Sequence, residues 1–217
     1  GEVLGGTRSL GAALQQYRAS VEAGVSEGNL PRFVRVTRFP EYALPRDVRR
    51  FFQVANIHLD NAFACQYDPD TMNRLGWLVQ LPSETEVAAA TALTGRFYCA
   101  YRPTVEEVSF EVANQLFHQT VDFPVMQNLD DCGVLLDNVP VDISSDIIPS
   151  LLFPFQVVEV RSLPDRKAPT VAVNSKFPMS GRRFILKMVS PLERFSIWRE
   201  KNRTLMGANS LRISPIV

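Results

Sequence analysis

Val134-Leu135-Leu136-Asp137-Asn138-Val139 is a short apolar strand that ends in asparagine and valine, and it opens one of two similar stretches of this sequence. A second apolar strand follows at Arg182-Arg183-Phe184-Ile185-Leu186-Lys187-Met188, and a helix pattern begins just after it. An upstream copy has the same order, with strands at Phe33-Val34-Arg35-Val36-Thr37-Arg38-Phe39-Pro40 and Leu75-Gly76-Trp77-Leu78-Val79-Gln80-Leu81. Each copy predicts strand, helix, strand, strand, helix, strand. The sequence therefore predicts two consecutive copies of one α+β module.

Bulk composition is that of a folded chain. Hydrophobic residues make up 46% of the 217 residues and charged residues 21%, which are ordinary values for a globular domain. No apolar run approaches the roughly 20 residues that span a bilayer, and no signal peptide opens the sequence. A cleaved targeting peptide stays open, because Gly1 is not an initiator methionine. Three widely spaced cysteines without a CxxC pair favour a reducing compartment over a disulfide framework.

Charge is unevenly distributed, although the formal net charge is zero. From Gly133 onward the chain has twelve Lys or Arg and seven Asp or Glu, an excess of five positive charges that the preceding part must balance. This distribution permits a local basic patch without making the chain a general polyanion binder. Ordinary solvated surface charge is about as good an explanation for any single arginine. The acidic part still contains an arginine cluster: Arg32, Arg35, Arg38, Arg46, Arg49 and Arg50.

Residues 1–30 are predicted to form an N-terminal helical extension. Leu10, Leu14, Tyr17 and Val21 recur at three to four residues, so one face of this helix is apolar. We expect the helix to dock on a neighbour or a partner, and a plain solvent-facing extension is the alternative.

Residues 31–109 are predicted to form the first module. A helix begins at Leu44-Pro45, with proline just inside its start, and the second strand covers 57–67. Ser83 begins the second helix, and Glu86 three residues later predicts a capping box. The last strand or strand pair is expected within 98–108.

Residues 110–131 are predicted to be an apolar linker, and residues 132–217 the second module. The linker contains too many large apolar residues to remain solvated, so we expect it to pack between the modules or to clamp one sheet. Within the second module, a long proline-containing loop is expected over 163–181, and a helix from Pro191 reaches about Leu205.

The two copies resemble the RNA recognition motif, a ferredoxin-like βαββαβ sandwich that reads RNA with aromatic side chains on its two central strands. Its first-strand signature is apolar, aromatic, apolar, any residue, Asn, Leu, and residues 134–139 fit five of these six positions. The stacking aromatics are missing from both copies, and Trp77 falls on the inward-facing phase. Other residues take the stacking positions: Leu135, Arg183 and Ile185 in the second copy, and Arg35, Gly76 and Leu78 in the first.

The resemblance implies RNA as a partner, but with an altered mode of contact. Stacking contributes roughly 1–3 kcal/mol per base, so without aromatics the sheets should read single strands poorly. Arginine can still stack on bases or pair with phosphate. We therefore expect structured RNA with low sequence specificity, bound through these residues: Arg35, Arg38, Arg49, Arg50, Arg182, Arg183, Lys187, Arg199, Lys201 and Arg203. The last helix and its exit carry Arg199, Lys201 and Arg203, and solvation alone would explain these three.

No catalytic motif is present. The sequence has no P-loop, no G-x-S-x-G elbow and no H-E-x-x-H. His58 and His118 are the only histidines, and turn formation explains the acidic pairs, so we expect no enzyme activity, no metal site and no cofactor.

Two functions of different classes follow from the resemblance. The first is a non-catalytic component of a ribonucleoprotein assembly, which contacts RNA through Arg and Lys and protein subunits through its degenerate sheets. The mitochondrial ribosome or organellar RNA processing is the favoured setting, in the mitochondrial matrix, with the nucleus or cytoplasm as alternatives. The second is a protein-interaction scaffold without RNA affinity.

Overall fold

The computed structural model describes residues 7–60, 62–164 and 181–217. It divides into two compact units, Gly1–Phe123 with Val217 and Pro124–Ile216, here called unit 1 and unit 2. Residues 1–6 of the predicted N-terminal extension and most of the predicted 163–181 loop lie outside the described residues.

Unit 1 contains one antiparallel sheet of four strands in the order β2-β3-β1-β4. Two helices alternate with the strands in the βαββαβ order, and two more flank the module. The strands are β1 (Arg32–Thr37), β2 (Phe63–Tyr67), β3 (Arg74–Leu81) and β4 (Thr104–Val108). The α-helices are α1 (Thr7–Glu22), α2 (Pro45–Gln53), α3 (Glu84–Thr91) and α4 (Phe110–Val121), and a short 3-10 helix, η1, spans Glu27–Asn29.

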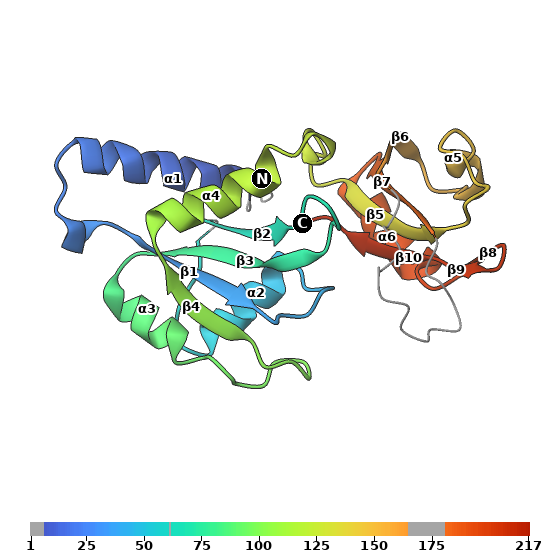
Figure 1. The fold of residues 1–217 in the computed structure, drawn as a ribbon. Helices are drawn as coiled ribbons and strands as arrows, with labels where there is room; N and C mark the ends of the chain where they lie inside the picture. The colour runs from blue at the N-terminus through green and yellow to red at the C-terminus, as the bar shows by residue number, and fades with distance from the viewer. Residues whose placement is uncertain (1–6, 61, 165–180) are drawn as a thin grey trace, which may run out of the picture. The chain divides into compact units, whose positions relative to one another are not determined.

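Each face of this sheet is covered by one pair of helices (Figure 1). Strand alternation puts Trp77 and Phe63 on the face of α2 and α3, where Trp77 is buried as its inward phase predicted. The opposite face packs against α1 and α4. Its cluster consists of Leu10, Leu14, Phe33, Ala64, Leu78, Ala113 and Phe117.

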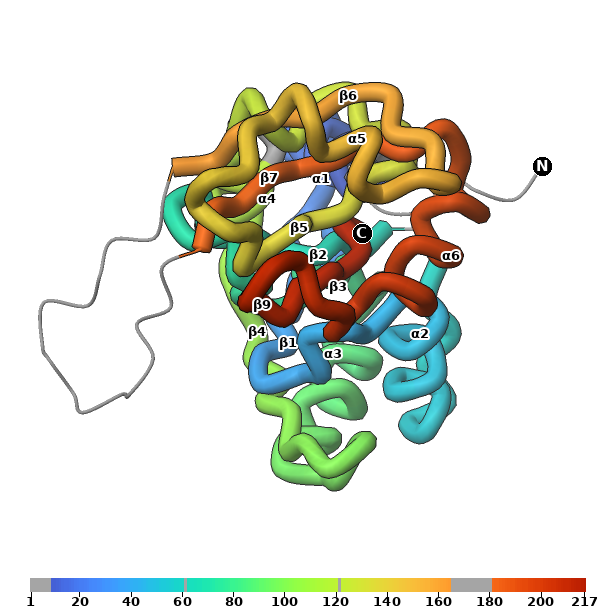
Figure 2. The backbone as a smooth tube through the Cα atoms, turned by 90° about the vertical axis from the view of Figure 1, so that its right-hand side faces the viewer, coloured from blue at the N-terminus to red at the C-terminus, as the bar shows by residue number. Residues whose placement is uncertain are grey.

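Unit 2 repeats the topology, with the sheet order β10-β5-β7-β6. Figure 2 shows β5, β7 and β6 of this sheet next to one another. Its strands are β5 (Gly133–Val139), β6 (Val157–Ser162), β7 (Arg182–Met188) and β10 (Arg212–Pro215). The crossing helices are α5 (Ile148–Leu151) and α6 (Pro191–Lys201), a 3-10 helix η2 (Pro124–Met126) precedes β5, and a small hairpin joins β8 (Leu205–Met206) to β9 (Asn209–Ser210).

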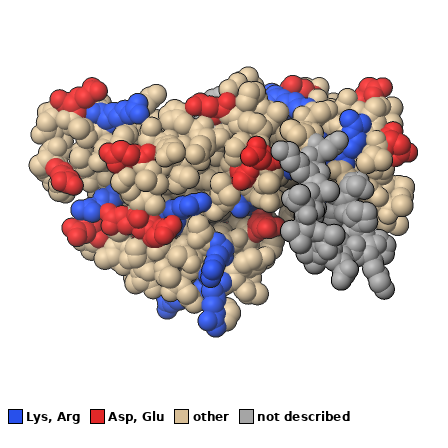
Figure 3. All heavy atoms as spheres, in the orientation of Figure 1, with Lys and Arg blue, Asp and Glu red and all other residues tan. Residues whose placement is uncertain are grey.

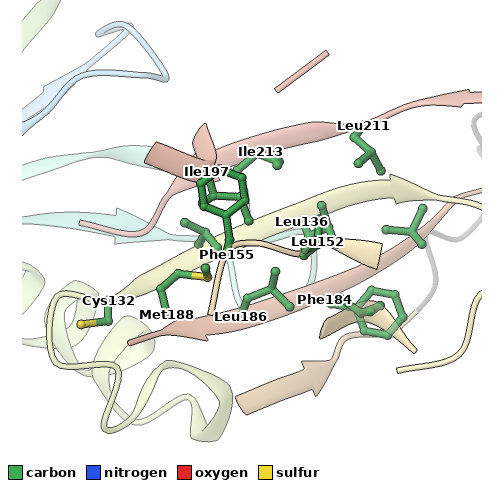
Figure 4. Packing of buried hydrophobic residues seen from close by; sticks show 13 residues of the cluster. Cys132, Leu136, Leu152, Phe155, Phe184, Leu186, Met188, Ile197, Leu211 and Ile213 are labelled. Atoms are coloured by element: carbon green, nitrogen blue, oxygen red, sulfur yellow. The ribbon is translucent and has the colours of Figure 1, made fainter. Parts of the chain in front are cut away.

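The core of unit 2 lies between its sheet and these helices. Alternate residues of β5 and β7, such as Leu136, Phe184 and Leu186, point toward Ile197 of α6 and Leu152 beside α5 (Figure 4). Both units thus have the predicted ferredoxin-like, RRM-like fold, in an α+β chain that begins with a helix.

Several boundaries differ from those predicted. Strand β2 starts at Phe63 rather than at 57, β4 starts at Thr104 rather than near 98, and α6 ends at Lys201. Ser83 makes no side-chain hydrogen bond to the helix backbone, because its hydroxyl donates to the Glu86 carboxylate instead. The expected linker is divided between the units: 110–121 is the regular helix α4 of unit 1, and 124–131 belongs to unit 2.

Candidate nucleic-acid interface

The outer face of the unit 1 sheet holds the residues aligned with the stacking positions. Arg35 pairs with Leu78 across β1 and β3, and Glu106 lies on the other side of Arg35 on β4. The stacking positions of this face hold no aromatic, as the alignment predicted, but strand alternation places another ring, Phe33, on the same face. Phe33 is only 1% exposed, since the rings of Tyr17 and Phe110 enclose it with centroids 5.7 and 6.1 Å away. A base therefore has no access to this ring.

Close packing and buried hydrogen bonds fix helices α1 and α4 on that face. Gly11 lets α1 pass close to Phe117 of α4, because a Cβ there would sit 3.0 Å from the ring. The buried hydroxyl of Thr120 on α4 accepts a hydrogen bond from the Tyr67 backbone N–H of β2 at 3.1 Å and lies 3.3 Å from the Gln66 amide oxygen. These contacts join α4 to the edge strand, so any ligand of the sheet must first displace two packed helices.

The outer face of the unit 2 sheet carries cationic side chains, and these side chains donate hydrogen bonds to backbone carbonyls of the same unit. Arg161 on β6 makes a bidentate pair with Glu159, both bonds at 2.9 Å, and donates to the carbonyls of Val125 and Gln127. Lys187 on β7 donates to the carbonyl of Asn128 and to the Asp130 carboxylate. The pairing lowers the pKa of the Glu159 carboxyl and raises that of Arg161. These cations therefore fasten the segment before β5 to the sheet.

Within each unit, the predicted RNA-binding residues do not converge on one surface. Arg183 is 2% exposed and donates to the Pro164 carbonyl, whereas Arg182 lies on the opposite face and donates to the Ile143 carbonyl. On α2, Arg49 lies over the Phe63 ring at 5.0 Å, and Arg50 is exposed. The remaining three, Arg199, Lys201 and Arg203, follow one another along α6 and its exit, where Arg199 lies 3.7 Å from Glu200.

Three loops meet at one end of the unit 1 sheet, and we call their joint surface the loop-end surface: residues 38–44, 68–73 and 95–103. The register brings them together, because the end of β1 lies beside the starts of β3 and β4, and the end of β2 lies beside the start of β3. Among the described residues, five that are neither Gly, Asn nor Asp have positive φ, and four of them lie here: Arg38, Met72, Cys99 and Ala100. Such backbone clusters at functional sites.

The 95–103 loop presents aromatic rings and arginines. Cys99 and Ala100, at φ 47° and 68°, form a tight turn closed by two hydrogen bonds between the backbones of Tyr98 and Tyr101. Phe97 is 69% exposed, with the Arg102 guanidinium 4.3 Å from its ring centroid. Figure 3 shows Lys and Arg side chains over this loop, at the lower edge of unit 1.

Tyr98 anchors the same loop to the body of unit 1. Its ring stacks on Phe39 at 5.1 Å, and its hydroxyl donates to the Asp47 carbonyl on α2. Burial and the charge of Asp47 raise the pKa of this hydroxyl, so it stays protonated as a donor at neutral pH. The anchored loop holds Phe97 outward without requiring it for the core.

The neighbouring loops add charge and another ring. Arg38 is exposed, and its side chain makes no ion pair with the described residues. Tyr42 is also exposed. In the turn between β2 and β3, the backbone amides of Thr71 and Asp70 donate to Asp68 and lower the pKa of its carboxyl, which keeps this turn closed at neutral pH.

The sequence analysis missed this loop, although its signal was present. Residues 96–102 read Arg-Phe-Tyr-Cys-Ala-Tyr-Arg, which interleaves basic and aromatic side chains as nucleic-acid-binding surfaces do. Aromatic residues also favour a strand, so the sequence predicts a strand within 98–108 instead.

Acidic side chains on β4 repel polyanions from that edge of the unit 1 sheet. Figure 3 shows Asp and Glu gathered over β4, where Glu106 and Glu107 are exposed. Within the described residues, no cluster of three or more His, Cys, Asp or Glu could hold a metal ion. The helices that the structure describes are all too short or too polar to cross a membrane.

No protein-family model and no curated protein matches this chain. Similar solved structures exist. The N-terminal three RNA binding domains of the yeast splicing factor Prp24 are 14% identical, with a TM-score of 0.31 over 84% of this chain, which spans 63% of that structure. The RNA recognition domains 1 and 2 of Sex-lethal from Drosophila melanogaster are 15% identical, with a TM-score of 0.30 over 85% of this chain and 99% of that one.

A single-module comparison gives a similar result. Human G-rich RNA sequence binding factor 1 is 19% identical, with a TM-score of 0.35, and covers 39% of this chain and 88% of its own. Because these identities and TM-scores are low, we draw neither the fold nor the function of this chain from them. The fold follows from the strand order and connectivity of the two units.

Proposed function

We propose that this chain is a non-catalytic RNA-binding component of a ribonucleoprotein assembly, and that it contacts RNA through the loop-end surface of unit 1. The observation that carries the proposal is the pair of Phe97 and Arg102: an aromatic ring that is 69% exposed, with a guanidinium against it. Surfaces that bind single-stranded nucleic acid use this combination, in which bases stack on exposed aromatic rings and arginine adds cation–π contacts and charge.

Rings and cations in this arrangement suit RNA in particular. Every base offers a π-face for Phe97, and arginine supplies both stacking and a charge for phosphate. The covered sheet of unit 1 supports the same conclusion, because α1 and α4 occupy the face on which the resemblance would place RNA. We therefore propose Arg38, Arg96 and Arg102 as the main arginine contacts to RNA, in place of the predicted sheet residues Arg35 and Arg183.

Fluorescence anisotropy with an unstructured RNA and a hairpin RNA, titrated over salt, tests the proposal. Phe97→Ala should weaken binding roughly 5- to 150-fold, the equivalent of about 1–3 kcal/mol of stacking. Arg102→Ala should also reduce the slope of log affinity against log salt by about one unit. The matched control is Arg212→Ala, which removes one exposed charge from unit 2 and is not among the predicted RNA-binding residues.

RNA binding that survives both loop variants unchanged would move the contact elsewhere on the chain. The absence of RNA binding even at low salt would refute the proposal.

A protein-interaction scaffold is the second candidate, favoured by the surface of unit 2. Phe153 and Leu192 there are 78% and 76% exposed, and the cations of its sheet are engaged internally. Co-purification of the tagged full chain with a stable protein partner, in the absence of RNA binding, would favour this function. The mitochondrial matrix stays our proposed location, to be tested by imaging the tagged protein in its own cells.

A further inference from the structure

A hollow opens where the loop-end surface of unit 1 meets the start of β3, and Tyr101 is part of its lining. Its lining combines two guanidinium groups, one carboxylate and aromatic rings: Arg38, Glu41, Arg74, Trp77 and Tyr101, with Phe39 behind them. Three segments that are far apart in the sequence form the hollow: the loop after β1, the start of β3 and the 95–103 loop.

The walls of the hollow are held in place by the fold. Arg74 donates to the carbonyl of Ala43, and its guanidinium lies 6.0 Å from the Trp77 ring centroid. Tyr101 is fixed by its two backbone hydrogen bonds to Tyr98, which is itself stacked on Phe39. Arg38 extends from a left-handed backbone position at the rim. The backbone of the hollow and the side chain of Arg74 are therefore preformed, and the exposed side chain of Arg38 becomes ordered when a ligand enters.

We infer that this hollow takes one unpaired nucleotide of the bound RNA, with its base against Tyr101 and its phosphate at Arg38. A planar base can stack on the tyrosine ring, and a guanidinium is a preferred partner of phosphate. Glu41 repels phosphate but accepts hydrogen bonds from base N–H groups, so the carboxylate favours a nucleotide over a simple anion. This inference rests on the proposed function and adds the class of substrate to it.

A base can reach Tyr101 only when it is outside a helical stack. In a duplex, base faces are buried against one another and only phosphates and edges are offered. The hollow should therefore make the chain prefer RNA with unpaired bases, whereas exposed arginines outside the hollow, such as Arg96, can contact the phosphates of single strands and duplexes alike.

The test compares the affinity of the full chain for a short unstructured RNA with its affinity for the same strand annealed to its complement. Tyr101→Ala should weaken single-strand binding by about 5- to 150-fold and change duplex binding much less. Arg38→Ala should also weaken single-strand binding more than duplex binding, because it removes the phosphate contact of the nucleotide held in the hollow. Arg96→Ala is the matched control, because Arg96 is an exposed arginine of the same loop that does not line the hollow. It should weaken both forms to a similar extent.

Tyr101→Phe separates stacking from a folding defect, since it keeps the ring and should bind like the unchanged chain. The inference is overturned if Tyr101→Ala and Arg38→Ala leave the ratio of the two affinities unchanged, or if Tyr101→Phe loses as much as Tyr101→Ala. In both cases the proposed function stands as long as Phe97→Ala still weakens binding. Failure of the unchanged chain to bind either RNA would overturn both.

Discussion

Helix α1 should be an integral part of unit 1, and Leu14→Ala tests this directly. Leu14 is 3% exposed and packs in the cluster that joins α1 and α4 to the outer face of the sheet. Truncating a buried leucine removes its transfer free energy and leaves a cavity, which together cost about 2–5 kcal/mol. With an m-value of about 1–3 kcal/mol/M in urea, a loss of about 3 kcal/mol should lower the unfolding midpoint by at least about 1 M.

The assay is urea unfolding followed by tryptophan fluorescence. Trp77 is buried in unit 1, and Trp198 packs in unit 2, so a Trp198→Phe background makes the emission report unit 1 alone. The control on the same helix is Val21→Ala, at a position 49% exposed, where the change should stay within about 0.5 kcal/mol. If Leu14→Ala lowered the midpoint no more than Val21→Ala does, α1 would not cover the sheet, and the reasoning would be refuted.

Three further changes probe unit 1. Gly76→Ala should destabilise it by at least about 2 kcal/mol, measured by urea unfolding, because the new Cβ would meet the Val36 carbonyl at 2.3 Å and φ is 145°; a stable Gly76→Ala variant would contradict the β1–β3 packing. Thr120→Val should cost about 1–3 kcal/mol in the same assay, since it leaves the buried Tyr67 N–H without its acceptor, and a neutral effect would show that α4 is not pinned there. The folded state lowers the pKa of Asp68, so its carboxylate stabilises the fold above the unfolded pKa of about 3.9 and loses that contribution as pH falls through the lower folded value. Thermal melts should therefore show Asp68→Ala less stable than the unchanged chain at neutral pH and equal to it well below pH 3.9; a difference that persists in acid would mean another cause.

The fold was predictable because its signals are local and occur twice. Apolar alternation in residues 134–139 and 182–188 places Leu136, Phe184 and Leu186 in one core, as the structure shows. The same phase puts Arg183 and Ile185 on the outer face of β7. Trp77 followed from its phase in β3 in the same way. Period-two patterning fixes which side of a sheet each residue takes, and a single sequence carries that information.

The covering of the sheet was only partly predictable. The apolar spacing of Leu10, Leu14 and Tyr17 showed that the first helix needs a partner, but it did not identify the partner, and Val21 lies outside the contact. Helix α4 lies within residues 110–131, which the sequence predicts to be an apolar linker. Packing partners depend on tertiary geometry, such as the close approach at Gly11, which leaves little trace in local sequence.

The candidate site depended even more on tertiary structure. Arg38, Glu41, Arg74 and Tyr101 come from two loops and the start of β3, and only the strand register brings them together. Selecting arginines by their strand and helix positions therefore found Arg38 but not the rings beside it. Contacts such as those of Arg161 with the carbonyls of Val125 and Gln127 show the converse, since a cation on a sheet can be fully engaged within its own chain.

Photocrosslinking of the full chain to RNA that carries 4-thiouridine, followed by mass spectrometry of the linked peptides, tests the central claim most directly. The account predicts crosslinks in the 95–103 loop, at Phe97 or Tyr101, and in the loop that follows β1. These crosslinks should decline in the Phe97→Ala variant. Crosslinks that fall instead on β1 and β3, at Arg35 or Leu78, would show that RNA displaces α1 and α4 and binds the sheet, which contradicts the account.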